Sequence, residues 1–536
     1  MSYVLGVNAG TGTWHDASAC LIDADGTVLA LVEEERLSRV RHAPKQHVPT
    51  RAVQRCLELG GVTAEQLEAI AVGWDEPRMA LRSGQGWEFD SPEAFLAALG
   101  LGSSGAEVVF VPHHRAHAAS AFHASGRASA AVLVVDGNGE DESTSIFHAR
   151  RGHGMRRVER WPQVHSLGHV YEAASVWLGL GKRGEGKTMG LAAHLSGSLD
   201  DPGWLHVRDG ALASALGADP RAGYEETKHA WRALVARYAG QPAPDCSADR
   251  LDTDPVAVRV AAAAQHTVDT VLTWWAQRAR ERTGEHTLCL AGGVALNCAA
   301  NGRLPGDIYV PPVPHDAGVA LGAAWEVRPP GQLGVLSPYL GSLPGPVPDG
   351  DDLVVGEVDV DRLGELLAEG DVIGVCRGRA EAGPRALCHR SLLASPTTAG
   401  MRTDLNALKG REPWRPFGPV AAGGEHELWS SVGDLERYML GAAPLTAYGR
   451  RTVPAARHAD GTTRPQRLQP GDDALIHDLL RHLAASGHPP ALLNTSFNGP
   501  GEPLVDSAAD ALDCARRLGL RHLVLEDHLV TLQGGR

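Results

Sequence analysis

Apolar and polar positions near the start of the chain predict a strand followed by a hairpin. Residues 3–10 (YVLGVNAG) form a short apolar run that ends in small residues, which indicates a strand leading into a loop. In residues 18–35 (SACLIDADGTVLALVEEE), Asp25-Gly26 separates two β-rich segments, and this dipeptide is a strong hairpin signal. The pattern therefore predicts antiparallel strands on either side of a tight turn near residue 25.

A second unit of the same design begins near residue 130. Residues 130–140 (AAVLVVDGNGE) predict a strand that runs into a glycine-rich acidic loop, and residues 143–150 (STSIFHAR) predict the strand that returns beside it. Two copies of strand, polar glycine loop and strand indicate a duplicated fold. We expect a cleft between the two halves, with backbone N–H groups of the loops facing it.

Helix-like and strand-like segments alternate along the rest of the chain. The clearest long helix is the alanine-rich stretch 256–282. Strands that lead into helices are predicted over residues 107–124, 286–297 and 307–325. Such alternation predicts an α/β fold.

The composition changes to proline and glycine between residues 329 and 353, which is typical of a linker. The α/β pattern resumes after it, with a helix predicted at 361–370 and a strand at 371–376. We therefore expect three parts: a domain of two halves at 1–330, a Pro/Gly linker at 331–353 and an α/β domain at 354–536.

Charge and composition narrow the possible functions of the 536 residues. The formal net charge is −14, which opposes binding to nucleic acid or to an anionic membrane surface. No run of about 18 apolar residues predicts a transmembrane helix, and no secretory signal is visible. The eight cysteines form no CxxC pair, so we expect free thiols and a cytoplasmic protein.

The motif HHRAH contains His113 and His117, which a helix would place on one face, within reach of one metal ion. Asp136 and Asp316 follow predicted strands of the two halves and could complete the set. Two imidazoles and two carboxylates suit a divalent ion such as iron, zinc or manganese. The alternatives are a chance spacing among 25 histidines and, for Asp136, a carboxylate that caps its own loop.

Glycine-rich turns predict a nucleotide-binding cleft in the same region. Gly292 and Gly293 lie between a predicted strand and a helix, where the missing Cβ lets the backbone approach a ligand. The further candidates are Gly137 and Gly139 in VVDGNGE, Lys187 in GEGKTMGLA and Asn297 in AGGVALN. The spacing is not that of a P-loop, and a simple tight turn is the alternative for the glycine pair.

His15 is the candidate general base. It lies in the loop after the first predicted strand, on the side of the proposed cleft. Histidine is the usual base for a hydroxyl group, because its ordinary pKa is near 6.5. The alternative is a surface histidine beside Asp16.

The segment after the linker concentrates cations near glycine and proline turns. In an acidic protein such a concentration predicts an anion-binding site. The candidate residues are Arg379, Arg385, Arg390, Lys409, Arg411, Arg415 and Arg464, with Asn494, Thr495 and Ser496 as neutral partners. The alternative is a solvated arginine face, which Trp414, Phe417 and the neighbouring prolines oppose.

Taken together, these motifs resemble the O-carbamoyltransferases of natural-product biosynthesis, which include the nodulation-factor, aminoglycoside and cephem carbamoyltransferases. The motifs occur in order along nearly the whole chain: NxxxxxxHDAS, HHxxHAASA, VVDGxGE, GEGKTMGLA, AGGVALN, GPRALxxRS, REPWRPF and LNTSFNxxGEP. The resemblance implies an N-terminal ASKHA-type domain, which is a duplicated RNase H-like fold, and a C-terminal YrdC-like α/β domain.

The resemblance also implies an ATP-dependent reaction in two steps. Carbamoyl phosphate and ATP, with Mg²⁺, would give carbamoyl-adenylate in the second domain, and the first domain would transfer the carbamoyl group to a hydroxylated small molecule. By this resemblance, iron is the expected ion at His113, His117, Asp136 and Asp316, and His15 is the base. The carbamoyl phosphate and adenylate site would comprise Arg385, Arg390, Lys409, Arg415, Arg464, Asn494 and Ser496, with Arg415 catalytic. Cys388 departs from the family pattern, which more often has glycine there.

Three alternative functions fit the sequence less well. A fused tRNA threonylcarbamoyl-type enzyme is opposed by the acidic balance and by the lack of a Lys/Arg-rich tail. A non-catalytic ATP-sensing module would need neither His15 nor the arginine constellation, and a sugar kinase leaves the second domain unexplained.

We expect a role in antibiotic biosynthesis, and the identity of the acceptor stays open. Since all the anion-binding motifs follow the linker, we also expect residues 354–536 to form the adenylate by themselves.

Overall fold

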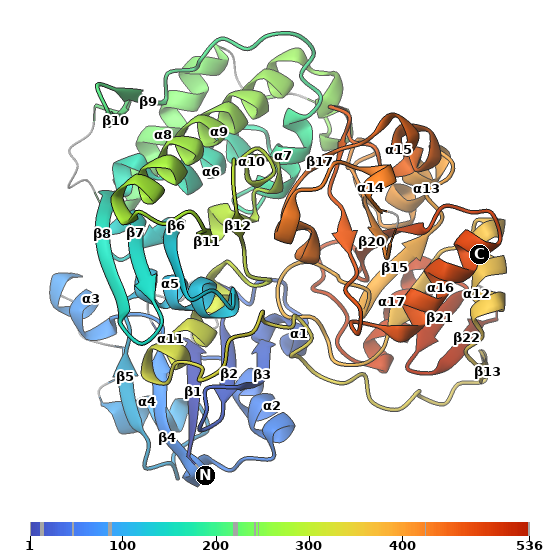
Figure 1. Ribbon diagram of the computed structural model, residues 1–536, viewed down its shortest axis with the longest axis horizontal. Coiled ribbons are helices and arrows are strands. Elements are labelled where there is room, and N and C mark those ends of the chain that lie inside the picture. The colour runs from blue at the N-terminus through green and yellow to red at the C-terminus, as the bar shows by residue number, and fades with distance from the viewer. Residues whose placement is uncertain are drawn as a thin grey trace.

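Two five-stranded sheets and one eight-stranded sheet organise the molecule (Figure 1). The computed structural model describes residues 2–10, 15–44, 48–83, 88–89, 91–217, 223–240, 243–244, 246–423 and 425–533. The two smaller sheets lie in residues 2–330, here called the N-terminal region, and the largest lies in residues 353–533, the C-terminal region. None of the helices in the described ranges is both long and apolar enough to cross a membrane.

The two smaller sheets have the same topology. The first has the order β3-β2-β1-β4-β5, and the second has the order β8-β7-β6-β11-β12. In each, three antiparallel strands are followed by two parallel ones. The strands are β1 (Tyr3–Asn8), β2 (Ser18–Ile22), β3 (Val28–Glu33), β4 (Leu67–Val72), β5 (Glu107–Phe110), β6 (Ser129–Gly139), β7 (Glu142–Arg150), β8 (Gly154–Pro162), β11 (Leu288–Ala291) and β12 (Ile308–Tyr309). This repeat confirms the predicted duplication and gives the N-terminal region an ASKHA-like fold.

Two helices between the sheets bring the two halves together. Helix α5 (His113–Ala124) packs on the second sheet and helix α11 (Val319–Val327) packs on the first, and the helices also contact each other. Glycine is required at two positions, one where β1 packs against α11 and one where α11 packs against α5. A Cβ on Gly6 of β1 would lie 1.8 Å from the Ala320 oxygen, and one on Gly322 would lie 1.7 Å from the Ala116 oxygen. This close packing places the start of each helix in the middle of the N-terminal region.

Helices also cover the outer faces of the N-terminal sheets. The longest is α9 (Pro255–Thr283), which confirms the helix predicted at 256–282 and begins at the capping side chain of Asp254. Around it lie α6 (Leu167–Trp177), α7 (Glu185–Ala192), α8 (Tyr224–Ala239) and the hairpin β9 (Leu205–Arg208) and β10 (Ala211–Ser214). The remaining helices are α1 (Glu34–Ser38), α2 (Thr50–Gly60), α3 (Glu76–Ser83), α4 (Pro92–Ala98) and α10 (Cys298–Asn301).

The C-terminal region is an α/β domain built on a mixed sheet of order β13-β22-β21-β14-β15-β20-β16-β19. Helices α12 and α16 pack together over one apolar cluster, and α17 contributes to another. The strands are β13 (Leu353–Glu357), β14 (Ile373–Cys376), β15 (Arg390–Ala394), β16 (Gly418–Ala421), β19 (Gln466–Arg467), β20 (Ala491–Ser496), β21 (His522–Leu525) and β22 (His528–Leu532), with the small pair β17 (Ala443–Pro444) and β18 (Thr462–Thr463). The helices are α12 (Val360–Glu369), α13 (Gly400–Leu408), α14 (Glu425–Leu428), α15 (Ala447–Thr452), α16 (Ala474–Ala485) and α17 (Ala508–Leu518).

The Pro/Gly segment between the two regions is hydrogen-bonded to both of them. The Leu340 oxygen accepts from Leu31 N of β3 at 3.1 Å, and Gly341 N donates to the Ala380 oxygen at 2.9 Å. The main apolar core of the N-terminal region also includes Trp414 and Tyr438. The two regions therefore face each other across an apolar contact, and the polar side chains at its edge come from both.

Candidate functional site

Four predicted metal ligands meet where the two N-terminal sheets face each other. His113 and His117 lie one turn apart at the start of α5, Asp136 lies in β6, and Asp316 begins the turn before α11. The two histidine Nε2 atoms are 3.1 Å apart. From these atoms to the Asp136 and Asp316 oxygens the distances are 3.4 to 3.8 Å. Four donor atoms this close to one another could all contact one ion.

Surrounding groups orient these ligands. His113 Nδ1 lies 3.1 Å from the Gly73 oxygen, so that Nε2 faces the carboxylates. Asp136 accepts a hydrogen bond from Gly293 N on Oδ1 and turns Oδ2 toward the histidines. Burial alone would lower the pKa of His113, but hydrogen bonds and charge from Asp136 and Asp316 raise it to about 10. The cluster favours positive charge, so its residues fit a divalent cation.

His15 lies beside this cluster and is held by Asp16. Its Nδ1 is 2.8 Å from one Asp16 oxygen, and His42 Nδ1 is 2.8 Å from the other. The His15 side chain keeps 42% of its surface exposed, whereas Asp16 is buried. Burial would lower the pKa of His15, but the charge and hydrogen bond of Asp16 outweigh it and raise the pKa to about 9. In this state the imidazole is protonated at neutral pH.

The glycine loops are close to the cluster, but the other predicted nucleotide-binding residues are engaged elsewhere. Gly292 has φ +89°, and a Cβ there would lie 2.2 Å from the Val135 oxygen, so the turn requires glycine. Gly137 has open space beside it, whereas a Cβ on Gly139 would meet the His114 ring. Asn297 caps α10 and pairs with the Gln265 amide. Its role in this structure is therefore local.

A second site lies in a cavity of about 490 Å³ between the N-terminal and C-terminal regions. Its lining brings together the predicted residues Lys187, Arg385, Arg415, Arg464, Asn494 and Ser496. Lys187 thus lines this cavity, where its Nζ lies 2.5 Å from the Glu412 carboxylate. The cavity also includes Glu35, Arg41, His42, Arg411 and Glu412. Of these, only Arg411 was predicted from the sequence; Glu35, Arg41, His42 and Glu412 were missed, although Arg41 and His42 belong to the basic run 36–42.

Basic side chains outnumber acidic ones in the lining of this cavity. Burial lowers the pKa of Arg385 to about 9, and the neighbouring Arg464 and Arg415 contribute to the shift. The pKa of Arg411 is also lowered, by burial and by Arg415 and Arg41. Arginines crowded in this way favour a bound anion, because it supplies the missing negative charge and accepts their hydrogen bonds.

Two predicted anion-binding residues are instead structural. The fully buried Arg390 guanidinium donates to five backbone oxygens, those of Ser342, Arg377, Gly378, His389 and Asp506. Lys409 Nζ donates to the Ser496 oxygen and to both oxygens of Asn498. All the hydrogen bonds that a lysine can donate are thereby used. Arg390 therefore fixes the loop that carries Arg385, and Lys409 fixes the turn after β20.

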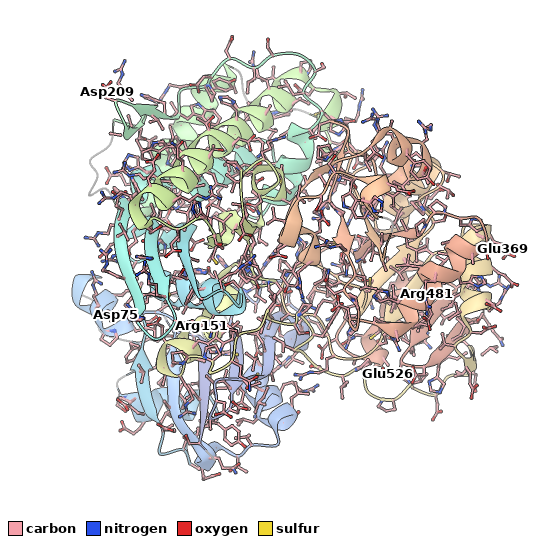
Figure 2. All side chains as sticks on the ribbon, viewed as in Figure 1. Asp75, Arg151, Asp209, Glu369, Arg481 and Glu526 are labelled. Atoms are coloured by element: carbon pink, nitrogen blue, oxygen red, sulfur yellow. The ribbon has the colours of Figure 1, made fainter. Side chains whose placement is uncertain are left out.

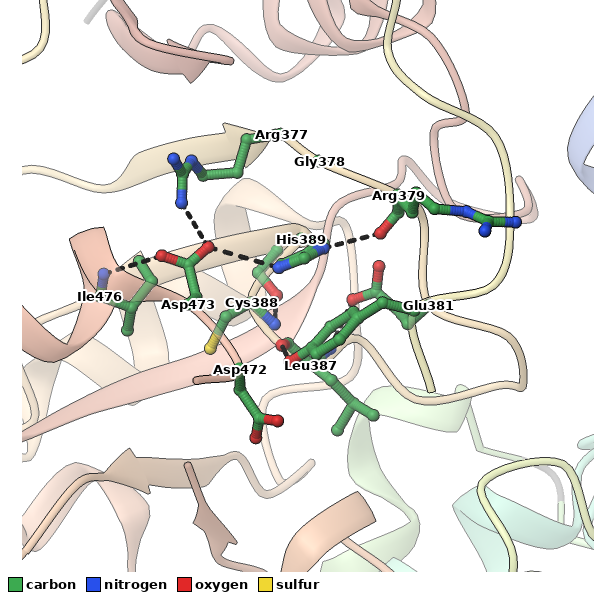
Figure 3. A network of polar contacts seen from close by, with 12 residues as sticks. Arg377, Gly378, Arg379, Glu381, Leu387, Cys388, His389, Asp472, Asp473 and Ile476 are labelled. Atoms are coloured by element: carbon green, nitrogen blue, oxygen red, sulfur yellow. Dashed lines mark hydrogen bonds and ion pairs between the residues drawn. The ribbon is translucent and has the colours of Figure 1, made fainter. Parts of the chain in front are cut away.

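The loop that carries Arg385 is further fixed by a polar network in the C-terminal region (Figure 3). Asp473 contacts Arg377 Nη1 at 2.5 Å and His389 Nε2 at 3.3 Å, while His389 Nδ1 lies 2.6 Å from the Arg379 oxygen. Within this loop Cys388 has φ +84°, a backbone conformation that favours glycine. This explains why glycine suits the position. Burial raises the pKa of the Cys388 thiol well above its ordinary value, so the thiol is unreactive.

The chain matches two family descriptions, "Carbamoyltransferase N-terminus" over residues 102–325 and "Carbamoyltransferase C-terminus" over residues 364–532. It is 31% identical to nodulation protein NolNO of Sinorhizobium fredii, across 96% of this chain and 79% of that protein. It is 28% identical to 3'-hydroxymethylcephem-O-carbamoyltransferase of Amycolatopsis lactamdurans, across 96% and 97% of the two chains.

Among solved structures, full-length HypF in its phosphate- and nucleotide-bound form covers 61% of this chain and 55% of its own, at 14% identity and a TM-score of 0.38. The family matches run through both regions and include the four predicted metal ligands and the cavity residues Arg385, Arg411, Arg415 and Arg464. The chain belongs to the carbamoyltransferase family and is an enzyme.

Proposed function

We propose that this enzyme uses ATP and carbamoyl phosphate to place a carbamoyl group on a hydroxyl of a small natural product. The observation that carries the proposal is the cationic cavity, whose arginines are buried together. A dianion as small as carbamoyl phosphate offers few atoms to recognise, so dense guanidinium contacts suit it.

The first proposed step forms carbamoyl-adenylate in this cavity. Water releases phosphate from carbamoyl phosphate, and an oxygen of the resulting carbamate attacks the α-phosphorus of ATP and displaces pyrophosphate. Arg385, Arg415 and Arg464 would hold the phosphate groups, and Arg415 would stabilise the charge that develops during the attack. Mg²⁺ would accompany ATP. Lys187 of the N-terminal region lines the same cavity, paired with Glu412, and would turn to the nucleotide.

The second proposed step transfers the carbamoyl group at the site between the N-terminal sheets. A divalent ion held by His113, His117, Asp136 and Asp316, for which we propose iron, would supply positive charge beside the phosphate of the leaving AMP. Gly137, Gly292 and Gly293 would let the nucleotide approach the backbone there. The acceptor oxygen attacks the carbamoyl carbon, and AMP departs with the pair of electrons from the broken C–O bond.

His15 is the proposed base for the acceptor hydroxyl. Because Nδ1 faces Asp16, Nε2 is the nitrogen left to take the hydroxyl proton. The raised pKa makes His15 a strong base once it has lost its own proton, and makes the protonated form dominant at neutral pH. The proposed activity should therefore increase with pH.

The name of the Amycolatopsis relative gives a hydroxymethyl cephem as its acceptor, and we propose a hydroxylated small molecule of comparable size for this chain. The test incubates the enzyme with ATP and carbamoyl phosphate and measures pyrophosphate, and then adds hydroxylated metabolites one at a time with ¹⁴C-labelled carbamoyl phosphate. Pyrophosphate release that requires carbamoyl phosphate, followed by label on a metabolite, supports the proposal. Label on tRNA, or ATP binding without turnover, would favour the alternatives instead.

A further inference from the structure

The loop that carries Arg385 is hydrogen-bonded to two residues of the N-terminal region. Gly383 N donates to Glu33 Oε1 at 2.6 Å, and Arg36 Nη2 donates to the Gly383 oxygen, also at 2.6 Å. Glu33 ends β3 and Arg36 lies in α1, so both side chains cross from one region to the other. The amide N–H and the carbonyl of one residue are thus both bound by the opposite region.

The two side chains that hydrogen-bond to Gly383 are buried. Glu33 is 4% exposed and Arg36 is 3% exposed, and the two side chains lie 3.5 Å apart. On its other side, Gly383 (φ +102°) lies against the N-terminal backbone, where a Cβ would be 2.2 Å from the Pro312 oxygen. Gly383 is therefore fixed from two directions by residues outside the C-terminal region.

Arg385 lies two residues further along the chain and lines the cationic cavity. Its guanidinium donates to the Leu296 oxygen of the N-terminal region at 3.3 Å. Its neighbours Arg464 and Arg415 are cations that repel it. Since these neighbours oppose its place in the cavity, the position of Arg385 depends on how its loop is held.

We propose that Glu33 and Arg36 are positioning residues that aim Arg385 into the anion site through Gly383. The N-terminal region is then a working part of the activation site, which contradicts the expectation that residues 354–536 form the adenylate by themselves. The proposal rests on the proposed function for the identity of the anion. The hydrogen bonds that position the loop do not depend on the reaction that the anion undergoes.

The test is a double-mutant cycle on the full chain, with Arg36→Gln, Arg385→Ala and the double variant. Calorimetric titration with carbamoyl phosphate, without ATP, measures the dissociation constant of each variant. We expect a roughly 10- to 100-fold weakening for Arg36→Gln, because a displaced Arg385 loses a hydrogen bond between charged groups, which is worth about that factor in affinity. We expect the double variant to bind no more weakly than Arg385→Ala, because Arg36 acts through Arg385.

Further variants separate the loss of the hydrogen bonds to Gly383 from a general loss of folding or of contact between the two regions. Glu33→Gln keeps an oxygen that can accept from Gly383 N and should bind carbamoyl phosphate within a few-fold of wild type, whereas Glu33→Ala should resemble Arg36→Gln. Arg127→Gln is the matched control, because Arg127 also pairs across the two regions, with Asp434 at 3.0 Å, but does not touch this loop. Thermal unfolding of every variant identifies those that do not fold, and the Glu33 pair carries the test if Arg36→Gln is one of them.

Unchanged affinity in a folded Arg36→Gln or Glu33→Ala variant would overturn the proposal, and so would multiplicative effects of Arg36 and Arg385. Absence of any carbamoyl phosphate binding to wild type would also overturn it. If binding weakens as expected but wild type releases no pyrophosphate with ATP, the positioning role stands and the proposed function fails. If wild type releases pyrophosphate and the variants bind as wild type does, the proposed function stands and the positioning role fails.

Discussion

Trp74 stacks on His113 with ring centroids 3.6 Å apart and an interplanar angle of 21°. The Trp74 indole N–H donates to Asn8 Oδ1, and Asn8 Nδ2 donates to the Asp16 oxygen. A predicted metal ligand and the residue that holds His15 are thus joined by three contacts. The metal cluster and the proposed base belong to one buried structure.

The stacking predicts that Trp74→Ala weakens metal binding. The His113 ring would lose the face that fixes its orientation, and changes around a metal ligand typically reduce affinity about 10- to 100-fold. Titration with Fe²⁺ or Zn²⁺ under anaerobic conditions measures the effect. Trp74→Phe keeps an aromatic face and should stay close to wild type. Equal affinity in wild type and Trp74→Ala would exclude this role.

His113→Ala should remove the bound ion and the transfer step while leaving pyrophosphate release intact. The reason is that the four ligands lie between the N-terminal sheets, whereas the cationic cavity lies between the two regions. Elemental analysis and the two half-reaction assays measure these effects. His123→Ala is a control on the same helix, since His123 lies outside the cluster. An unchanged metal content would show that the ligand assignment is wrong.

The transfer rate should rise with pH up to about 9. His15 must be unprotonated to accept the hydroxyl proton, and its pKa is raised to about 9, so the active fraction grows roughly tenfold per pH unit below that value. His15→Asn should lower transfer about 10²- to 10⁴-fold without changing pyrophosphate release.

Asp16→Asn tests the cause of the raised pKa. Removing the Asp16 charge should shift the pH profile of transfer toward the ordinary histidine value of 6.5. Asparagine is a suitable replacement because residue 16 has φ +56°, which asparagine tolerates. A transfer rate that is flat between pH 6 and 9 in wild type would argue against His15 as the base.

Arg415 and Arg390 should respond differently to the same substitution. Arg415→Ala removes a cation from the cavity and should abolish most pyrophosphate release with little change in thermal stability. Arg390→Ala removes a buried guanidinium that donates to five carbonyl oxygens, two of which, those of Ser342 and His389, keep a backbone donor, and should destabilise the fold by about 3 kcal/mol or more. Thermal unfolding and the pyrophosphate assay measure both. A stable but inactive Arg390→Ala variant would return Arg390 to the anion site.

Several features could be predicted from the sequence because they depend on local spacing. The Asp25-Gly26 turn and the VVDGNGE loop indicated the duplication, and helix periodicity placed His113 and His117 on one face. Asp136 and Asp316 needed more than spacing, since their meeting depends on how two sheets pack. The family resemblance supplied that information, and the structure brings all four residues together.

Other features could not be predicted because they depend on contacts between distant segments. The role of Arg390 is set by carbonyl groups from four separate parts of the chain, none of which has a side-chain signature. Lys187 lies in a glycine-rich motif but faces Glu412 of the other region. The hydrogen bonds that join Glu33 and Arg36 to Gly383 connect positions far apart in the sequence. Figure 2 shows the side chains of both regions on the ribbon.

Trapping the intermediate shows whether activation takes place in one cavity and transfer at another site. The full-length His113→Ala variant is incubated with ATP and ¹⁴C-labelled carbamoyl phosphate, and the products are separated by chromatography without an acceptor. We predict a labelled compound that contains AMP, formed in step with pyrophosphate and passed to an acceptor when wild-type enzyme is added. Transfer of label to an acceptor by wild type without ATP, or pyrophosphate release without any labelled adenylate, would contradict a reaction divided between the two sites.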